Sequence, residues 1–357
     1  MTKSPSERQT SYSRNNLSSP EIFLKRIHKI SQAETLPSLH SLARLCRKAG
    51  FILSNENTEY RPSVSVVEIP GGLIDFTSPW WEKTPVIVVP DIHARADFIY
   101  KVLCFRIPGQ DMTVLEALEK NMVRIVFAGD ILHSERQKKD RWLRAFEDYE
   151  RGIADGIPMR EEMADGLSAF KALFECKCRF PRNVHILKGN HENVKNCFEN
   201  GNRPFRKYAC EGEMVMHFMQ DVYGEALLNL YSSVENLLPL AAVFPQCVIS
   251  HGEPRTACSR SQIIDCPLDG DVSFNFIWTA NDEAEEGSVR AVMDSLYGGN
   301  VPAHSVYLGG HRPVFGKYAL RQDGLFVQIH NPDEENIAIV VPDRPFMPDS
   351  DIVSVNA

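Results

Sequence analysis

The sequence predicts an α/β protein, and two patterns together with the chain length support this fold class. Short, continuously apolar runs such as residues 86–89 and 123–128 are typical of strands that are buried on both faces of a sheet. Between such runs lie longer segments with apolar residues at every third or fourth position, which predict helices. The chain has 357 residues, which suits one large α/β domain with additions.

The part of the chain before the first of these strands divides into two segments. Residues 1–18 are rich in Ser, Asn, Thr and Arg, and we expect them to form a disordered tail. Ser19 followed by Pro20 is typical of a helix N-terminus, and a second helix is expected to stop at Gly50. We interpret residues 19–83 as an appendage of helices and short extended runs that packs on the main domain.

The main domain is predicted to span residues 84–343, and residues 344–357 are expected to form a C-terminal tail. Residues 136–182 are charged and have a helical pattern, so they predict an inserted helical cap or a peripheral helical hairpin. Residues 213–238 form a further amphipathic helical region. Besides the two strands named above, strands are expected at residues 184–187, 241–244, 246–250, 305–308, 325–329 and 337–341.

Composition excludes several classes of function. Lys and Arg number 39 against 47 Asp and Glu, a formal net charge of −8, which argues against a broad basic surface for nucleic acid. Nine cysteines without a CxxC spacing predict reduced thiols rather than disulfides or a zinc framework. No apolar run reaches the ~18 residues of a membrane span. We therefore expect a soluble cytoplasmic protein that does not insert in a membrane.

Five of the predicted strands run directly into residues that can bind a metal ion or move a proton. Sites in open α/β sheets form at the carboxyl ends of the strands, so these residues are expected to converge. Hard oxygen and imidazole ligands without thiolates suit manganese, iron or zinc, and manganese is favoured. The strand-end residues are Asp91 and His93, Asp130, Asn190 and His191, His251, and His311.

These residues are sufficient for two metal ions. A pair of ions about 3.5–4 Å apart needs a bridging carboxylate and several nitrogen or oxygen ligands for each ion. Asp91 and His93 can converge on one ion, and Asp130 suits the bridge because a carboxylate has two oxygens to share. The second ion would be completed by Asn190, His251 and His311.

The order of these motifs resembles the calcineurin-like metallophosphoesterase superfamily over about residues 84–343. D-x-H, G-D, G-N-H-E, H and G-H occur in this order in that family, and residues 276–279 are similar to an L-W-S segment of its phosphoprotein phosphatase branch. That branch also lacks a second histidine after the one that corresponds to His311. The resemblance implies a two-sheet β-sandwich flanked by helices.

The resemblance also implies a reaction and a role for each motif residue. Asp91, His93 and Asp130 would hold one divalent or trivalent metal ion, and Asp130 would share the second with Asn190, His251 and His311. His191 would be the general acid. The implied activity is hydrolysis of a phosphoprotein or small phosphomonoester, as in a serine/threonine phosphatase, by a hydroxide that bridges the metals. The alternatives are a phosphodiesterase or dinucleoside-polyphosphate hydrolase on the same centre, and a metal-binding scaffold with little activity.

One loop departs from the family pattern. The branch has G-D-x-x-D-R-G where this chain has G-D-I-L-H-S-E, so His133 and Ser134 replace the aspartate that orients the acid histidine and the arginine that binds phosphate. We expect His133 or Glu135 to orient His191 instead. The phosphate would then be contacted by His133 or by one of three arginines: Arg290, Arg95 or Arg136.

Overall fold

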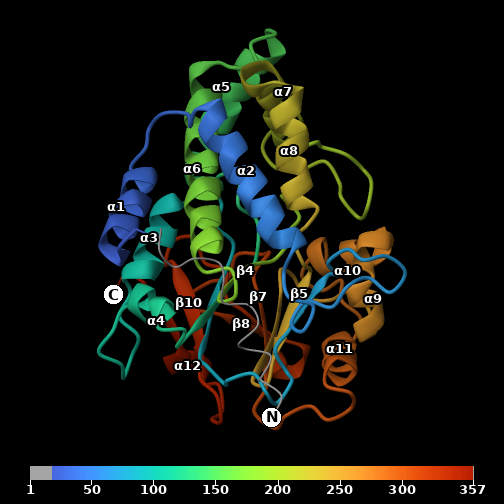
Figure 1. Cartoon of the computed structure of the whole chain (residues 1–357). Helices are drawn as coiled ribbons and strands as arrows, with labels where there is room; N and C mark the ends of the chain where they lie inside the picture. Colours follow the sequence, from blue (N-terminus) through green and yellow to red (C-terminus); the bar gives the residue numbers. More distant parts are fainter. Residues whose placement is uncertain (1–17, 357) are drawn as a thin grey trace.

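Two β-sheets lie face to face at the centre of the computed structural model, which describes residues 18–356, and helices cover both outer sides (Figure 1). The first sheet contains, in spatial order, β1 (Leu73–Asp75), β5 (Ala241–Phe244), β6 (Cys247–Ser250), β7 (Val306–Gly309), β9 (Phe326–Gln328) and β8 (Ala319–Arg321). The second contains β11 (Ile352–Ser354), β10 (Asn336–Val340), β2 (Val86–Val89), β3 (Arg124–Phe127) and β4 (Val184–Ile186). The predicted two-sheet sandwich flanked by helices is confirmed.

Strand β2 shows why its apolar run is continuous. Side chains on a strand alternate between the two faces of the sheet. Val86 and Val88 therefore contribute to the apolar core between the two sheets, whereas Ile87 and Val89 contribute to the core under the helices. All four residues are fully buried. Because each face of the second sheet is covered, neither face of this strand can be polar.

The direction of the strands brings six strand ends to one region. In the second sheet, β2, β3 and β4 are parallel neighbours, and in the first sheet β6, β7 and β9 are parallel neighbours. The carboxyl ends of parallel neighbours lie at the same edge of a sheet. Each sheet therefore contributes three strand ends to a common site.

Two sets of helices complete the outer layers. In Figure 1 the first set stands mainly above and to the left of the sheets, and the second set lies to the right. The set that shares an apolar core with the second sheet is α1 (Pro20–Ser31), α2 (Leu39–Ser54), α3 (Ala96–Cys104), α4 (Val114–Glu119), α5 (Lys139–Glu150), α6 (Ile157–Arg179), α7 (Glu211–Tyr223) and α8 (Glu225–Glu235). The set that packs on the first sheet is α9 (Arg260–Ile264), α10 (Gly270–Ile277) and α11 (Ser288–Leu296).

The N-terminal appendage is more closely integrated than the sequence indicated. The Ser19 hydroxyl caps α1 as expected, accepting a hydrogen bond from the backbone of Ile22. The second helix was predicted to stop at Gly50, which is wrong: α2 continues to Ser54 because Leu53 extends its buried face. Strand β1 adds to the edge of the first sheet beside β5. The tail expected at residues 1–18 lies, except for its last residue, outside the described residues.

Helices occupy the segment 136–182 as predicted, beginning with the short 3-10 turn Arg136–Lys138. The buried side chains of α6 belong to the same apolar core as the second sheet, so α6 is part of the helical layer. The helical region at residues 213–238 is divided into α7 and α8 at Gly224, whose φ of 83° ends a regular helix.

The C-terminal residues expected as a tail continue the second sheet. They contain α12 (Pro348–Asp351) and β11, which pairs antiparallel with β10. The Ile352 side chain is fully buried in the core between the sheets, which explains why this segment is ordered against the domain.

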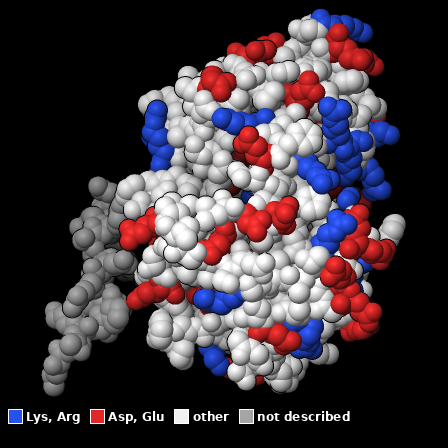
Figure 2. All heavy atoms as spheres, turned by 90° about the vertical axis from the view of Figure 1, so that its right-hand side faces the viewer, with Lys and Arg blue, Asp and Glu red and all other residues white. Residues whose placement is uncertain are grey.

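The state of the cysteines and the distribution of surface charge are those that the composition predicts. All nine cysteines have free thiols. Acidic and basic side chains are interspersed over the face shown in Figure 2, and neither sign covers it. None of the helices in the described part of the chain has both the length and the apolar character of a membrane span.

Candidate metal centre

Six strand ends place metal-competent side chains together between the two sheets. Five of them are those expected from the sequence, and the sixth, which follows β9, was not expected. Three groups of these side chains have ligand atoms close enough to hold a metal ion: Asp91, His93 and His330; His93, Asp130 and His191; and Asp130, His251 and His311.

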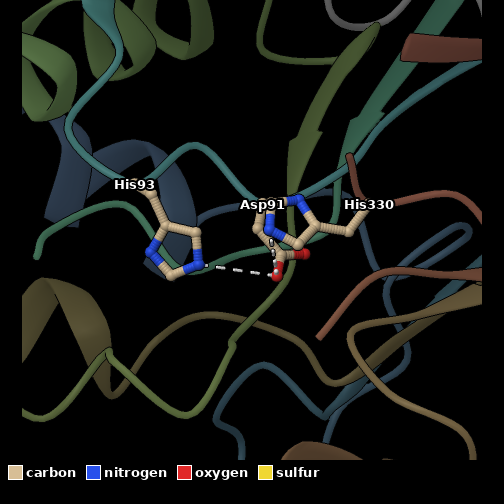
Figure 3. A group of neighbouring side chains, drawn as sticks. All are labelled: Asp91, His93 and His330. Carbon is tan, nitrogen blue, oxygen red and sulfur yellow. Dashed lines mark ion pairs between the residues drawn. The ribbon is translucent and has the colours of Figure 1, made fainter. Parts of the chain in front are cut away.

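The first group lies at the ends of β2 and β9. Figure 3 shows a ring nitrogen of His93 and one of His330 directed at the same oxygen of the Asp91 carboxylate. Asp91 Oδ2 is 3.6 Å from His93 Nε2 and 3.9 Å from His330 Nε2. Two adjacent ligand atoms that each lie about 2.1 Å from an ion are separated by about 3.0–3.5 Å. The spacing of this group is therefore close to that of a coordination shell.

Asp130 joins the first group to a second one. Its Oδ2 atom is 3.7 Å from His93 Nε2 and 3.5 Å from His251 Nε2. His251 Nε2 is in turn 3.0 Å from both Asn190 Oδ1 and His311 Nδ1. A single carboxylate oxygen thus faces both groups of side chains.

Each aspartate has one oxygen engaged by the backbone and one directed at the other ligands. Asp91 Oδ1 accepts a hydrogen bond from the backbone N–H of His311 at 3.0 Å, and Asp130 Oδ1 accepts one from that of His191 at 2.9 Å. The sequence argument assumed that Asp130 would share both oxygens. In the structure one oxygen fixes the carboxylate, and Oδ2 alone faces both groups.

Two glycines are required for this close approach of backbone and carboxylate. A Cβ atom at Gly189 would lie 2.2 Å from the Asp130 carboxylate, and one at Gly310 would lie 1.9 Å from that of Asp91. Any side chain there would displace the aspartates. Asp130 and His93 also have positive φ values of 50° and 44°, a conformation that costs free energy and is concentrated at functional sites.

Backbone carbonyl groups orient two of the histidines. His93 Nδ1 donates to the carbonyl oxygen of His133 at 3.0 Å, and His251 Nδ1 donates to that of Ala128 at 2.9 Å. A proton fixed on Nδ1 leaves the lone pair of Nε2 free for a metal ion. In both residues Nε2 is the atom that faces the aspartates.

Glu192, the last residue of the G-N-H-E motif, has a structural role. Its carboxylate accepts hydrogen bonds from the backbone N–H groups of Gly189, Asp130 and Ile131 at 2.7, 2.9 and 2.8 Å. These contacts tie the loop after β4 to the loop after β3. They therefore fix the position of Asp130 relative to Asn190.

The buried charges of the centre are balanced by protons in the metal-free protein. Burial raises the pKa of Asp130 to about 7. Burial also opposes the ionisation of Asp91, but the imidazoles of His330, His251 and His93 together outweigh it and hold the pKa of Asp91 well below its usual range. The pKa of His93 rises to about 9 because Glu135 and the two aspartates outweigh burial. A buried cluster of carboxylates needs positive charge, which metal ions also supply.

His191, the expected general acid, forms a pair with His133. Their Nδ1 atoms are 3.0 Å apart, so one ring donates a proton to the other. Burial lowers the pKa of His133 to about 3, and burial together with nearby His93 lowers that of His191 well below its usual range. The pair is therefore neutral. His191 Nε2 lies 3.6 Å from Asp130 Oδ2, within the metal centre.

His330 and Glu135 are the residues that the sequence argument missed or misplaced. Glu135 was one of two residues considered for orienting His191, the other being His133, but its Oε2 lies 3.0 Å from His330 Nε2 and its Oε1 lies 3.7 Å from His93 Nε2. His330 follows the predicted strand 325–329 directly. The strand-end rule that gave the other ligands would therefore have identified it.

Comparisons with known proteins identify the fold. No family model and no curated protein matches the chain. A solved structure of a protein serine/threonine phosphatase from Saccharomyces cerevisiae, with similarity to human phosphatase PP5, matches with a TM-score of 0.55 and 13% identity, covering 94% of this chain and 95% of that chain. The chain therefore shares the fold of this serine/threonine phosphatase.

Two further solved phosphatases are similar to a lesser degree. A cold-active protein tyrosine phosphatase matches with a TM-score of 0.39 and 11% identity over 76% of each chain. The cold-active protein-tyrosine phosphatase of a psychrophile, Shewanella sp., matches with a TM-score of 0.33 and 12% identity over 79% of this chain and 82% of that one.

Within this fold, the three arginines considered for phosphate binding are directed elsewhere. Arg95 donates to three backbone carbonyls, those of Ile92, Asp91 and Pro332. Arg136 pairs with Asp333 on the surface, and Arg290 is exposed on α11. In residues 18–356, none of the three guanidinium groups contacts a side chain of the metal groups. Among the predicted phosphate contacts in the described residues, only His133 is hydrogen-bonded to the side chain of the proposed general acid.

Proposed function

We propose that this chain is a phosphoesterase that uses two metal ions to hydrolyse phosphomonoesters, in the manner of a serine/threonine protein phosphatase. The observation that carries the proposal is the position of Asp130 Oδ2, buried between His93 of one ligand group and His251 of the other. The fold of the yeast serine/threonine phosphatase supports it. The two groups also contain buried polar atoms that have no partner among the described residues, Asp91 Oδ2 and His311 Nε2, as expected of ligands.

The proposed ligands divide between the two ions. The second ion would be held by Asp130, Asn190, His251 and His311, as the sequence indicated. The first would be held by Asp91, His93 and Asp130, with two additional ligands, His330 and Glu135.

Glu135 is assigned to the first ion because of its contact with His330. A ring nitrogen that binds a metal carries no proton, so His330 Nε2 cannot then donate to the carboxylate. Their 3.0 Å separation matches that of two ligands of one ion.

Bound metal ions in such a site activate water for attack and neutralise the charge of a phosphate. Oxygen and imidazole ligands without thiolates suit manganese, and also iron or zinc. The substrate would be a phosphoprotein or a small phosphoester.

His191 would donate a proton to the leaving oxygen. If His133 donates its Nδ1 proton within the pair, the proton of His191 lies on Nε2, the atom that faces the metal centre. A neutral imidazole is a weaker acid than an imidazolium ion, so the pair favours substrates whose leaving group needs little protonation. His133 would therefore serve as the orienting partner in place of the family aspartate.

The cysteines support a proposed cytoplasmic location. Nine thiols without a disulfide are typical of a protein that functions in a reducing compartment.

Metal analysis and a substrate panel test the proposal. The protein would be reconstituted with manganese, and metal content measured by elemental analysis. Hydrolysis would be compared for p-nitrophenyl phosphate, its bis ester, a phosphopeptide and diadenosine tetraphosphate. We expect two ions per chain and preferential hydrolysis of the monoesters. Preference for the bis ester or the dinucleotide would support the diesterase or polyphosphate hydrolase alternative, and two ions without hydrolysis would support the scaffold.

A further inference from the structure

We propose that Lys207 contacts the substrate phosphate, in place of the arginine that the loop after β3 lacks. This inference rests on the proposed phosphoesterase function and concerns the same site. It is carried by the course of residues 203–208, which lie between β4 and α7 and pass over the metal centre.

The segment covers the histidine pair. The Phe205 ring lies against His191, with ring centroids 3.8 Å apart, and its centroid is 5.1 Å from that of His133. Phe205 is itself only partly buried, so it separates the pair from solvent. Residues 203–208 therefore form one wall of the site on the side of the proposed general acid.

Lys207 extends from this wall to the first metal group. Its Nζ atom is 3.5 Å from Glu135 Oε1, which is 3.7 Å from His93 Nε2. The side chain of Lys207 is 41% exposed, whereas that of Glu135 is 6% exposed. The ammonium group therefore lies at the boundary between the buried centre and solvent, where a phosphate would enter.

The backbone of the segment is fixed by α7 and by the loop after β4. The fully buried carboxylate of Glu211 accepts hydrogen bonds from the backbone N–H groups of Lys207 and Tyr208, at 2.9 and 2.6 Å. At the other end, the amide of Asn193 donates to the carbonyl oxygen of Arg203 at 3.1 Å. These contacts hold the Lys207 side chain on the side of the metal centre.

Lys207 retains the capacity to bind a ligand. A lysine ammonium has three N–H donors, and the contact with Glu135 is longer than an ordinary charge-assisted hydrogen bond of about 2.7–2.9 Å. Ser134 offers no charge, and its hydroxyl donates to the buried carboxylate of Glu162, which also pairs with Arg141. An arginine from that loop is thus replaced by a lysine from another loop.

A measurement of phosphate binding distinguishes a contact between Lys207 and phosphate from a role in which Lys207 only neutralises the charge of Glu135. Binding of inorganic phosphate to the full-length, manganese-loaded protein would be measured by isothermal titration calorimetry. We expect Lys207→Ala to weaken phosphate binding about tenfold to a hundredfold, as for loss of a charge-assisted hydrogen bond, and to leave the manganese content unchanged. Lys207→Arg should retain most of the affinity.

Arg206→Ala is the matched control, because it removes the same charge one residue away. The Arg206 side chain is 66% exposed, and its guanidinium lies 3.7 Å from the carboxylate of Glu213 on α7. Equal phosphate affinity in the wild type and Lys207→Ala, or equal weakening in Lys207→Ala and Arg206→Ala, would overturn the assignment. Loss of manganese in Lys207→Ala would also overturn it, in favour of an ion-pair role. A wild type that retains no manganese would refute the proposed function itself, and the assignment with it.

Discussion

The groups of proposed metal ligands and the loops that cover them differ in how their side chains are held in place. The proposed ligands other than Glu135 follow strand ends from two sheets, and hydrogen bonds with backbone groups hold the side chains of Asp91, His93, Asp130 and His251. The loop at His133–Glu135 and the segment 203–208 are irregular and come from distant parts of the chain. Strand ends are constrained by the whole sheet, whereas a loop can change its side chains without moving the ligands. Apart from Glu135, the proposed ligands can therefore stay in place while the side chains that contact the substrate change.

Removing the shared ligand should have the largest effect. Asp130→Asn replaces a charged bridging oxygen by a neutral amide, so we expect loss of both ions and of detectable hydrolysis. His93→Ala removes a ligand of the first ion and should chiefly weaken that ion. Elemental analysis after dialysis measures both results. Two retained ions in Asp130→Asn would show that this carboxylate is not the bridge.

Removing the proposed acid should leave the metals in place and reduce the rate. We expect His191→Ala to lower kcat by about 10²–10⁴, the usual contribution of a general acid. The loss should be smaller for esters with very good leaving groups, because their oxygens need no proton. A series of aryl phosphates measures this dependence. An equal loss across the series would mean that His191 positions the phosphate instead.

Removing the metal ions should make stability depend on pH. In the metal-free protein the pKa of His93 is raised to about 9, above the ordinary value of about 6.5. The stabilisation from protonated His93 is fully present below pH 6.5 and is lost as the pH rises through 9. Urea unfolding with and without a chelator should therefore show a decline from pH 6.5 to 9 that is larger in the metal-free protein. Parallel pH profiles would contradict this account of the centre.

The smallest expected effect concerns the loop rather than the metals. His133→Asp would place a carboxylate beside His191 and favour its protonated form, so the acid should remain active to higher pH, by about 1 unit or more. His133→Asn is the control, since it has nearly the same shape without the charge. The pH profile of kcat for p-nitrophenyl phosphate measures the shift. If both variants behave alike, His133 does not control the protonation of His191.

The sequence by itself predicted most of the strands and most of the side chains that the structure brings together in the three ligand groups. A continuous apolar run such as Val86–Val89 can be recognised locally because it must be buried on both faces. The residue at the end of each run is equally local information, which is why Asp91, Asp130 and His251 could be named as candidate ligands. The resemblance to the calcineurin-like family added the two-sheet arrangement, which the fold comparison confirms.

Tertiary structure decided which of the remaining strand-end and loop side chains reach the centre. His330 joins the first group because β9 lies beside β7, and sheet order depends on contacts between distant segments. The Glu135 carboxylate faces His330 rather than His191. Lys207 reaches the centre because the Glu211 carboxylate holds its backbone. Similarly, α2 continued past Gly50 because its last turn is buried against neighbouring helices. Spacing along a chain encodes periodic burial, but it does not encode which loops fold over a site.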